Sequence, residues 1–355
     1  MRVLFVRLSS FGDVVFALPA AKALKTALPG AHLAWAIEGP LAPLLEGAPY
    51  VDEILVANTR AWRKDLLGRK TREGISDFLR KGRGAGEGGE PFDLVVDAQG
   101  LFKSGLIAAA IPAARKVGFG FRTATERINC LFTDERVDVD RAVRPHVLDQ
   151  MLALAEHVTG KTDFERTPDV RHLVERKDEI VDAWLAQNGK RPFAVLQPFS
   201  SKVNKEWGAD DLLAFAEKLS ADGIQPVLRW GPGEESRAQE LLTLSKKSSS
   251  SSSSSPLRAN SSSSLLLLAP ATTPASSARL AARAALFVGA DTGPTHLAAA
   301  AGAPTLALFG PTPAERFSPV GPRTAVFREF PADYNRSASR WPADAVHEAA
   351  RRLLA

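Results

Sequence analysis

Short apolar runs alternate along the whole chain with segments whose apolar residues recur at helical spacing. Residues 2–8 predict a first strand, and apolar positions from Val14 to Leu28, three or four apart, predict a helix after it. Pro29 and Gly30 predict the end of that helix. Further strands are expected at 33–37, 54–56 and 94–96, and helices at 101–111 and 146–158. This alternation is typical of parallel sheets covered by helices.

A second set of the same kind begins near Phe193. Its expected strands are 194–197, 227–230, 265–268, 286–288 and 305–309. Its expected helices are 210–221, 234–244, 276–285, 295–301 and 343–354. Two consecutive sets predict an α/β protein with two Rossmann-like domains and a cleft between them. In such sheets, ligands bind beyond the carboxyl ends of the strands.

The predicted boundary lies in the polar stretch 161–177. It divides the chain into an N-terminal domain, residues 1–165, a C-terminal domain, residues 166–342, and a closing helix, residues 343–355. Residues 245–264 are nearly all serine and lack the apolar surface that offsets the entropy of ordering. They predict a disordered surface insert with no evident chemical role.

Composition indicates a cytoplasmic globular protein. Hydrophobic residues make up 45% of 355, yet no apolar stretch approaches the ~20 residues of a membrane-spanning helix. The N-terminus shows no signal-peptide pattern. Cys130 is the one cysteine, so neither an intramolecular disulfide nor an all-cysteine metal site is possible.

The net charge of +5 favours anionic partners only mildly. Residues 60–83, however, carry nine Lys or Arg against Asp65, Glu73 and Asp77. These cations are either a solvated helix face or a patch for an anionic acceptor or membrane surface. The nine cations are Arg60, Arg63, Lys64, Arg69, Lys70, Arg72, Arg80, Lys81 and Arg83.

The first strand runs into a tight turn with an acid after it. Ser9, Ser10 and Gly12 permit a close backbone approach, but the G-x-G-x-x-G spacing of a dinucleotide site is absent. Asp13 follows at the start of the expected helix. It has two interpretations: a helix cap, or a general base that takes the proton of an attacking hydroxyl.

In the second domain, residues 289–296 follow a strand and open a helix. Thr292 and Gly293 lie where free backbone N–H groups collect, and Pro294 suits a first helical turn. Such a helix start favours a phosphate through its donors and its dipole. His296 lies one turn further and is expected to reach the same ligand.

Two more turns follow strands of this domain. Residues 197–207 bring Lys202 and Lys205, either of which could neutralise charge on a leaving diphosphate. Residues 230–235 bring Glu234 and Glu235, suited to a ribose or base. Together these turns predict a nucleotide-sugar site.

These motifs, with Asp97–Ser104, Lys205–Trp207 and 310–312, resemble the ADP-heptose:lipopolysaccharide heptosyltransferases, glycosyltransferase family 9, and within it the heptosyltransferase I branch. The resemblance runs from Met1 to about Pro313. It implies a GT-B architecture and inverting transfer, with no obligatory metal, of L-glycero-D-manno-heptose from ADP-heptose to Kdo of the lipopolysaccharide inner core.

The resemblance also implies roles for residues. Asp13 would be the general base, and Lys205 would contact the donor phosphates. The implied donor-binding residues are Ser10, Gly12, Lys202, Glu234, Glu235, Asp291, Thr292, Gly293, Thr295 and His296. The implied acceptor-binding residues are Arg60, Trp62, Arg63, Lys64, Gln99 and Lys103.

The implied partners are ADP-heptose, a Kdo-bearing lipid A acceptor and, peripherally, the anionic inner face of the bacterial inner membrane, with no nucleic acid. One departure is Thr125, where the family places an Arg; Arg122 and Arg127 are the candidates to replace it. Lys202 remains a rival to Lys205 for the phosphate contact.

Three alternatives stay open. Within the class, the enzyme could be heptosyltransferase II or another transferase that adds a later heptose. From other classes, the candidates are a sugar-nucleotide epimerase of the same fold and a nucleotide-sugar binding protein without catalysis. The presence of Asp13 together with Lys205 argues against the last.

Overall fold

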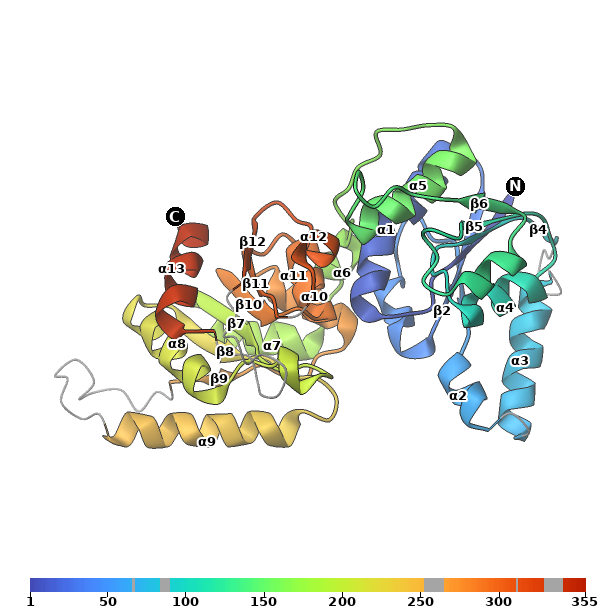
Figure 1. Cartoon of the computed structure of the whole chain (residues 1–355). Helices are drawn as coiled ribbons and strands as arrows, with labels where there is room; N and C mark the ends of the chain where they lie inside the picture. The colour runs from blue at the N-terminus through green and yellow to red at the C-terminus, as the bar shows by residue number, and fades with distance from the viewer. Residues whose placement is uncertain (66–67, 84–89, 252–264, 311, 329–340) are drawn as a thin grey trace. The chain divides into compact units, whose positions relative to one another are not determined.

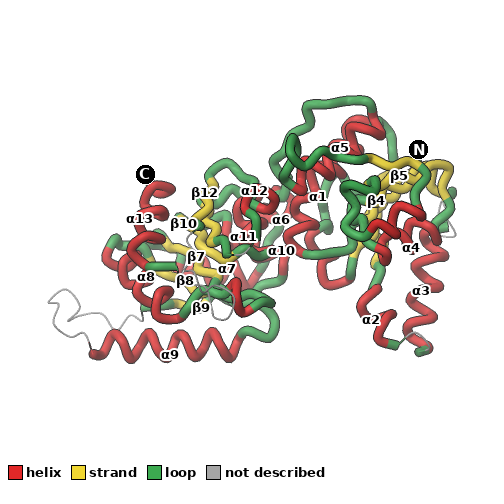
Figure 2. Tube along the Cα trace, viewed as in Figure 1, coloured by secondary structure: helices red, strands yellow, loops and turns green. Residues whose placement is uncertain are grey.

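The computed structural model describes residues 1–65, 68–83, 90–251, 265–310, 312–328 and 341–355. The chain forms two compact units, Met1–His172 and Leu173–Ala355. Each unit is an α/β layer structure in which helices flank one parallel sheet (Figures 1 and 2). Among the described residues, no helix has both the length and the apolar character that crossing a membrane requires.

The N-terminal unit contains a six-stranded parallel sheet of order β3-β2-β1-β4-β5-β6. Its strands are β1 (Arg2–Val6), β2 (His32–Ile37), β3 (Glu53–Val56), β4 (Phe92–Asp97), β5 (Ala113–Phe119) and β6 (Glu135–Val137). Its helices are α1 (Phe11–Ala27), η1 (Gly39–Leu44), α2 (Thr59–Lys64), α3 (Arg69–Gly82), α4 (Phe102–Ala110), η2 (Arg127–Phe132) and α5 (Val147–Thr159). α6 (Arg171–Glu175) spans the division between the units.

Helices cover both faces of this sheet, which explains why its central strands read as continuous apolar runs. α3 and α4 pack on one face, where Phe78 and Ile107 join Leu4 and Val6 of β1 in one core cluster. α1 and α5 pack against each other, and Phe5 meets Trp35 edge to face at 4.7 Å between ring centroids.

The C-terminal unit repeats the topology with the order β12-β11-β10-β7-β8-β9. Its strands are β7 (Phe193–Gln197), β8 (Gln225–Leu228), β9 (Leu267–Leu268), β10 (Leu286–Ala290), β11 (Thr305–Leu308) and β12 (Thr324–Phe327). Its helices are α7 (Glu179–Asn188), η3 (Val203–Lys205), α8 (Ala209–Ala221), α9 (Glu235–Ser251), α10 (Pro274–Ala281), α11 (Gly293–Ala300), α12 (Ala314–Phe317) and α13 (Ala343–Leu354).

Two core clusters lie on opposite faces of this second sheet. One joins α8, α9 and α13 to the strands around Leu196 and Val288; the other joins α7, α10 and α11 around Val195 and Phe287. In both units the strand order reverses between the first and fourth strands, as in Rossmann folds, and ligands bind at that reversal. The reversals lie between β1 and β4 and between β7 and β10.

The expected α/β class and its parallel sheets are confirmed. The prediction of a disordered insert is wrong at its start, because α9 continues through Ser251. Ser245 is buried, and its hydroxyl donates to the Leu242 carbonyl at 2.7 Å. The hydrogen-bonding requirement of this buried hydroxyl is therefore met within the helix. Residues 252–264 lie outside the described part of the chain.

Candidate functional site

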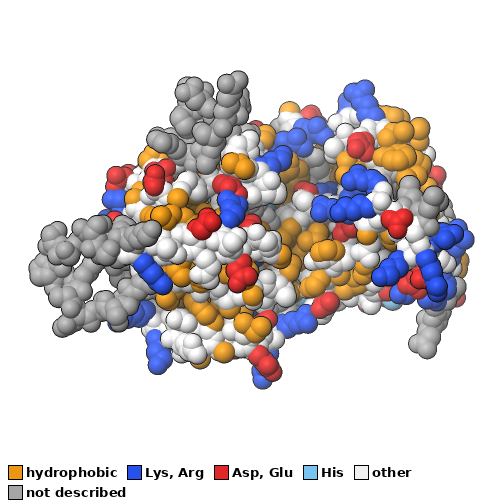
Figure 3. Space-filling model, turned by 90° about the horizontal axis from the view of Figure 1, so that it is seen from below, with side chains coloured by type: hydrophobic (Ala, Val, Ile, Leu, Met, Phe, Trp, Pro, Cys, Tyr) orange, Lys and Arg blue, Asp and Glu red, His pale blue; other side chains and the backbone are white. Residues whose placement is uncertain are grey.

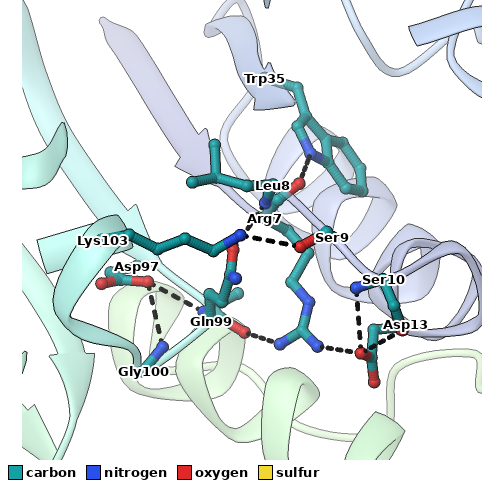
Figure 4. A network of polar contacts seen from close by, with 11 residues as sticks. Arg7, Leu8, Ser9, Ser10, Asp13, Trp35, Asp97, Gln99, Gly100 and Lys103 are labelled. Carbon is teal, nitrogen blue, oxygen red and sulfur yellow. Dashed lines mark hydrogen bonds and ion pairs between the residues drawn. The ribbon is translucent and has the colours of Figure 1, made fainter. Parts of the chain in front are cut away.

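Asp13 occupies the first turn of α1, at the strand-order reversal of the N-terminal unit (Figure 4). Its Oδ2 accepts from the Ser10 hydroxyl at 2.8 Å and the Ser10 amide at 3.1 Å, and lies 2.9 Å from Nη2 of Arg7. Within the described residues, Oδ1 receives no donor. The capping interpretation is therefore confirmed, while one oxygen stays available for chemistry.

Arg7 is buried behind Asp13 and fixed from two sides. Its Nη1 donates to the Ala98 carbonyl at 2.7 Å, and its own carbonyl accepts from Trp35 Nε1 at 3.0 Å. Burial alone would raise the pKa of Asp13, but the charge of Arg7 and the Ser10 hydrogen bonds outweigh it, so the pKa lies below its ordinary value. Asp13 is thus an ionised carboxylate at neutral pH.

The loop after β4 is built on a buried carboxylate, Asp97. It accepts from Asn129 Nδ2 at 2.6 Å, the Ser104 hydroxyl at 2.8 Å and the Gln99 amide at 2.9 Å. Burial raises the pKa of Asp97, and these hydrogen bonds oppose the rise. Gln99 is itself buried, and its Oε1 accepts from the Leu8 amide at 2.8 Å. The ends of β1 and β4 are thereby joined.

Lys103 extends from the start of α4 toward the β1 turn. Its Nζ donates to the Ser9 hydroxyl at 3.0 Å (Figure 4). The same Nζ lies 3.9 Å from Oε1 of Glu38. Burial, together with the charges of Arg60, Arg7 and Arg63, lowers the pKa of Lys103 against the opposing effect of Glu38. Positive potential is therefore concentrated beside the turn that carries Asp13.

A pocket of about 290 Å³ opens next to this turn, within the N-terminal unit. Its wall is formed by the turn after β1 (residues 9–11), the segment after β2 and the start of α2. Its lining residues are Ser9, Ser10, Phe11, Glu38, Pro40, Leu41, Asn58, Arg60 and Ala61. The buried carboxylate of Glu38, which accepts from the Thr59 hydroxyl, joins the Ser9 and Ser10 hydroxyls and the Asn58 amide as a polar group of this wall for a polyhydroxylated ligand.

The basic residues of α2 reach solvent: Arg60, Arg63 and Lys64 are exposed. Trp62, expected to contact the acceptor, is half-buried and packs on Phe78 of α3 at 5.8 Å between ring centroids. Its position anchors α2 to α3 and directs the three cations outward.

In the C-terminal unit, Asp291 directly follows β10 and is the centre of a polar triad. Lys205 Nζ lies 2.6 Å from its Oδ2, and His296 Nε2 lies 3.2 Å from its Oδ1. Burial opposes ionisation, but His296 and Lys205 outweigh it and hold the pKa of Asp291 well below its ordinary range. Of the two candidate lysines, Lys205 therefore lies at the strand-order reversal between β7 and β10, where it pairs with Asp291. Lys202 is exposed.

The start of α11 lies beside this triad. Thr292 is its N-cap residue but makes no capping bond; its hydroxyl and that of Thr295 donate to the Ala290 carbonyl at 3.3 and 2.7 Å. Gly293 is the first helical residue and Pro294 follows it. Because Thr292 leaves the first amides of α11 uncapped, this helix end is suited to an anionic ligand.

Glu234 and Glu235 differ in their surroundings. Glu234 Oε2 accepts from the Gly231 amide at 2.7 Å and so closes the turn after β8. Glu235 begins α9 and is exposed.

Two buried arginines that directly follow strands, Arg7 and Arg229, were not predicted as site residues. Arg229 Nη1 donates to Gln197 Oε1 at 2.5 Å, and its Nε to the Ser277 hydroxyl at 3.0 Å. Burial lowers the pKa of Arg229 to about 10, against the attraction of Glu234. The available signal was a charged residue directly after an apolar strand.

The acids and histidines form no metal centre in the described ranges: no group of three or more His, Cys, Asp or Glu side chains could hold an ion. The charged groups near the reversals are instead arranged as cation–carboxylate pairs.

Comparison with known proteins places this geometry in a family. Residues 88–340 match the model of glycosyltransferase family 9 (heptosyltransferase). Lipopolysaccharide heptosyltransferase 1 of Salmonella typhimurium is 27% identical over 88% of this chain and 89% of its own length. The enzyme of that name from Pseudomonas aeruginosa is 28% identical over 88% of this chain and 79% of its own.

Solved structures agree. The E. coli heptosyltransferase WaaC with ADP superposes with a TM-score of 0.81 at 25% identity, covering 99% of this chain and 100% of that one. The two Rossmann-like units are those of the GT-B class. The chain belongs to glycosyltransferase family 9, the heptosyltransferases, and is a glycosyltransferase.

Proposed function

We propose that this enzyme transfers L-glycero-D-manno-heptose from ADP-heptose to a Kdo residue of the lipopolysaccharide inner core, with inversion at the anomeric carbon. The relatives named lipopolysaccharide heptosyltransferase 1 support the acceptor class, and the WaaC structure with ADP supports the nucleotide. The heptosyltransferase I assignment ranks above a later-acting transferase, because the relatives with 26–28% identity carry that name.

The observation that carries the mechanism is the asymmetry of Asp13. Three donors hold Oδ2, whereas Oδ1 receives none among the described residues. The acceptor hydroxyl gives its proton to Oδ1 as its oxygen bonds to the anomeric carbon. The bond from that carbon to the phosphate oxygen breaks, and ADP leaves with the electron pair.

The C-terminal unit binds the donor in this proposal. Lys205, Thr292, Gly293 and the start of α11 stabilise the charge that develops on the leaving diphosphate. These groups replace a metal ion, so transfer should proceed in the presence of EDTA. Loss of activity in EDTA, restored by a divalent cation, would contradict this part.

The N-terminal unit, residues 1–165 in the sequence prediction, binds the acceptor. The pocket beside Ser10 takes the sugar, and the guanidinium groups of Arg60 and Arg63 fit the Kdo carboxylates. Because the acceptor is anchored in lipid, the enzyme works peripherally at the cytoplasmic face of the inner membrane.

A mass-spectrometric assay with ADP-heptose and Kdo-bearing lipid A tests the proposal. One added heptose, absent in Asp13→Ala, is the expected result. Transfer only to a phosphorylated, already heptosylated core would move the enzyme to a later step. An epimerised nucleotide sugar would indicate an epimerase, and donor binding without product a binding protein.

A further inference from the structure

An apolar surface lies on α4 and η2 of the N-terminal unit. Phe102, Leu106, Ile128 and Leu131 are 43%, 45%, 50% and 68% exposed, although all four are large hydrophobic residues. We call these four side chains the α4–η2 surface. Clustered apolar exposure of this kind marks a site of interaction more often than a scattered single residue does.

Helical spacing groups the four side chains into two pairs. Phe102 and Leu106 are four residues apart on α4, so they share one face. Ile128 and Leu131 are three residues apart on the 3₁₀ helix η2, where such positions eclipse each other. Within η2, Asn129 and Cys130 are buried while Ile128 and Leu131 point outward.

The two elements are packed rigidly against each other. The Phe102 ring lies 5.8 Å from that of Phe132, and Asn129 Nδ2 donates to the Leu101 carbonyl at 2.8 Å. A Cβ added at Gly105 would lie 2.4 Å from the Phe132 ring, which shows how closely α4 approaches η2. The α4–η2 surface is therefore a preformed feature.

Cations adjoin this surface. Lys103 follows Phe102 on α4, and the nearby charges of Arg60 and Arg63 of α2 help to lower its pKa. Arg127 precedes Ile128 on η2. Two acids lie nearby: Glu126, whose carboxylate accepts from the Phe102 amide at 2.5 Å, and exposed Asp134. Figure 3 shows that hydrophobic and basic side chains are both exposed on the face of the molecule seen from below.

The surface also adjoins the candidate active site, because Lys103 Nζ donates to the Ser9 hydroxyl beside Ser10. A lipid-linked acceptor must present its sugar at this loop while its acyl chains stay in the bilayer. An apolar surface with adjacent cations at that place matches an anionic membrane in both polarity and charge.

We propose that the α4–η2 surface docks the enzyme on an anionic bilayer, with its four apolar side chains entering the interfacial region and the exposed cations Arg127 and Lys64 contacting lipid phosphates. The inference rests on the proposed function only in that the acceptor is membrane-anchored. It adds an apolar contact to the basic segment 60–83 identified from sequence.

The test is sedimentation of the full chain with vesicles of phosphatidylethanolamine and phosphatidylglycerol. The double variant Ile128→Ser/Leu131→Ser should bind at least about tenfold more weakly than the wild type. Phe102→Ser/Leu106→Ser, on the other helix, should weaken binding similarly. The matched control is Ile180→Ser on α7, which removes a 62% exposed isoleucine and should leave binding unchanged.

Unchanged vesicle binding in both double variants would overturn the inference, as would equally strong wild-type binding to phosphatidylcholine vesicles. Conversion of a wild-type dimer to monomer by the double variants would assign the surface to a second copy of this chain and also overturn it. Turnover of a Kdo acceptor without acyl chains should be retained by the variants. Failure of the wild type on that acceptor would contradict the proposed function while leaving the vesicle result interpretable.

Discussion

Arg7 contacts Asp13 through one carboxylate oxygen only: Nη2 lies 2.9 Å from Oδ2, the oxygen that also accepts both Ser10 donors. The second guanidinium nitrogen, Nη1, is committed to the Ala98 carbonyl. The buried guanidinium therefore orients the carboxylate as well as neutralising it. We therefore expect the Asp13 carboxylate to hold one orientation and to have a low pKa. It is expected to accept a proton only from the acceptor hydroxyl in the reacting complex.

Replacing Arg7 with Met should reduce turnover and shift its pH dependence. Asp13 must be ionised to act as a base, and Arg7 lowers its pKa. Without that charge the pKa of Asp13 rises, so the acid limb of kcat/KM should move to higher pH. A pH–rate profile checks this shift, which a purely structural defect would not produce.

Arg7→Lys is the matched control, since it keeps the charge and should keep the acid limb close to that of the wild type. The ion pair also contributes to stability. Because the folded pKa of Asp13 is depressed, this contribution is present above the unfolded value of about 3.9 and lost as pH falls through the folded value. Identical acid limbs in Arg7→Met and the wild type would remove Arg7 from this role.

Asp13→Asn should retain donor binding and lose turnover. The amide keeps the shape of the side chain but lacks a basic oxygen, and general-base catalysis typically contributes about 10²- to 10⁴-fold. Calorimetric titration with ADP and the mass-spectrometric transfer assay measure the two effects separately. Asp149→Asn, which alters only the surface pair with Arg166, is the control. Wild-type turnover in Asp13→Asn would assign the base elsewhere.

Lys205→Met should weaken ADP binding, whereas Lys202→Met should not. Hydrogen bonds to charged groups contribute about 1.5–3 kcal/mol, which corresponds to roughly 10- to 150-fold in the dissociation constant. Lys205 is half-buried and paired with Asp291 at 2.6 Å, while Lys202 is exposed. Calorimetry on both variants decides between the two lysines, and the opposite pattern would make Lys202 the phosphate contact.

Asp97→Ala should destabilise the N-terminal unit by about 3 kcal/mol or more, because buried donors of Asn129, Ser104 and the Gln99 amide would lose their acceptor. Hydrogen exchange of β4 and α4 amides in urea measures the loss within that unit. Asp134→Ala removes an exposed acid and should change little. Equal protection in both variants would show that the Asp97 network is dispensable.

Two elements were not predicted because their sequence signals are weak. β5 (Ala113–Phe119) was not identified, because Arg115 and Lys116 interrupt its apolar pattern in the partly exposed first half of the strand. The helical start of the serine tract was also missed: serine composition favours disorder, but Ala238 and Leu241 fix the apolar face of α9 in the core and the helix continues beyond them.

By itself, the sequence determined the α/β class, the two parallel sheets and the turns that carry Asp13, Lys205 and Asp291. Local periodicity specifies strands and helices, and the carboxyl ends of parallel strands meet at one edge. Only the tertiary structure decided which charges meet: that Arg7 holds Asp13, and that Lys205 rather than Lys202 joins Asp291. Pairing across 86 residues, as between Lys205 and Asp291, depends on strand order, which no local pattern encodes.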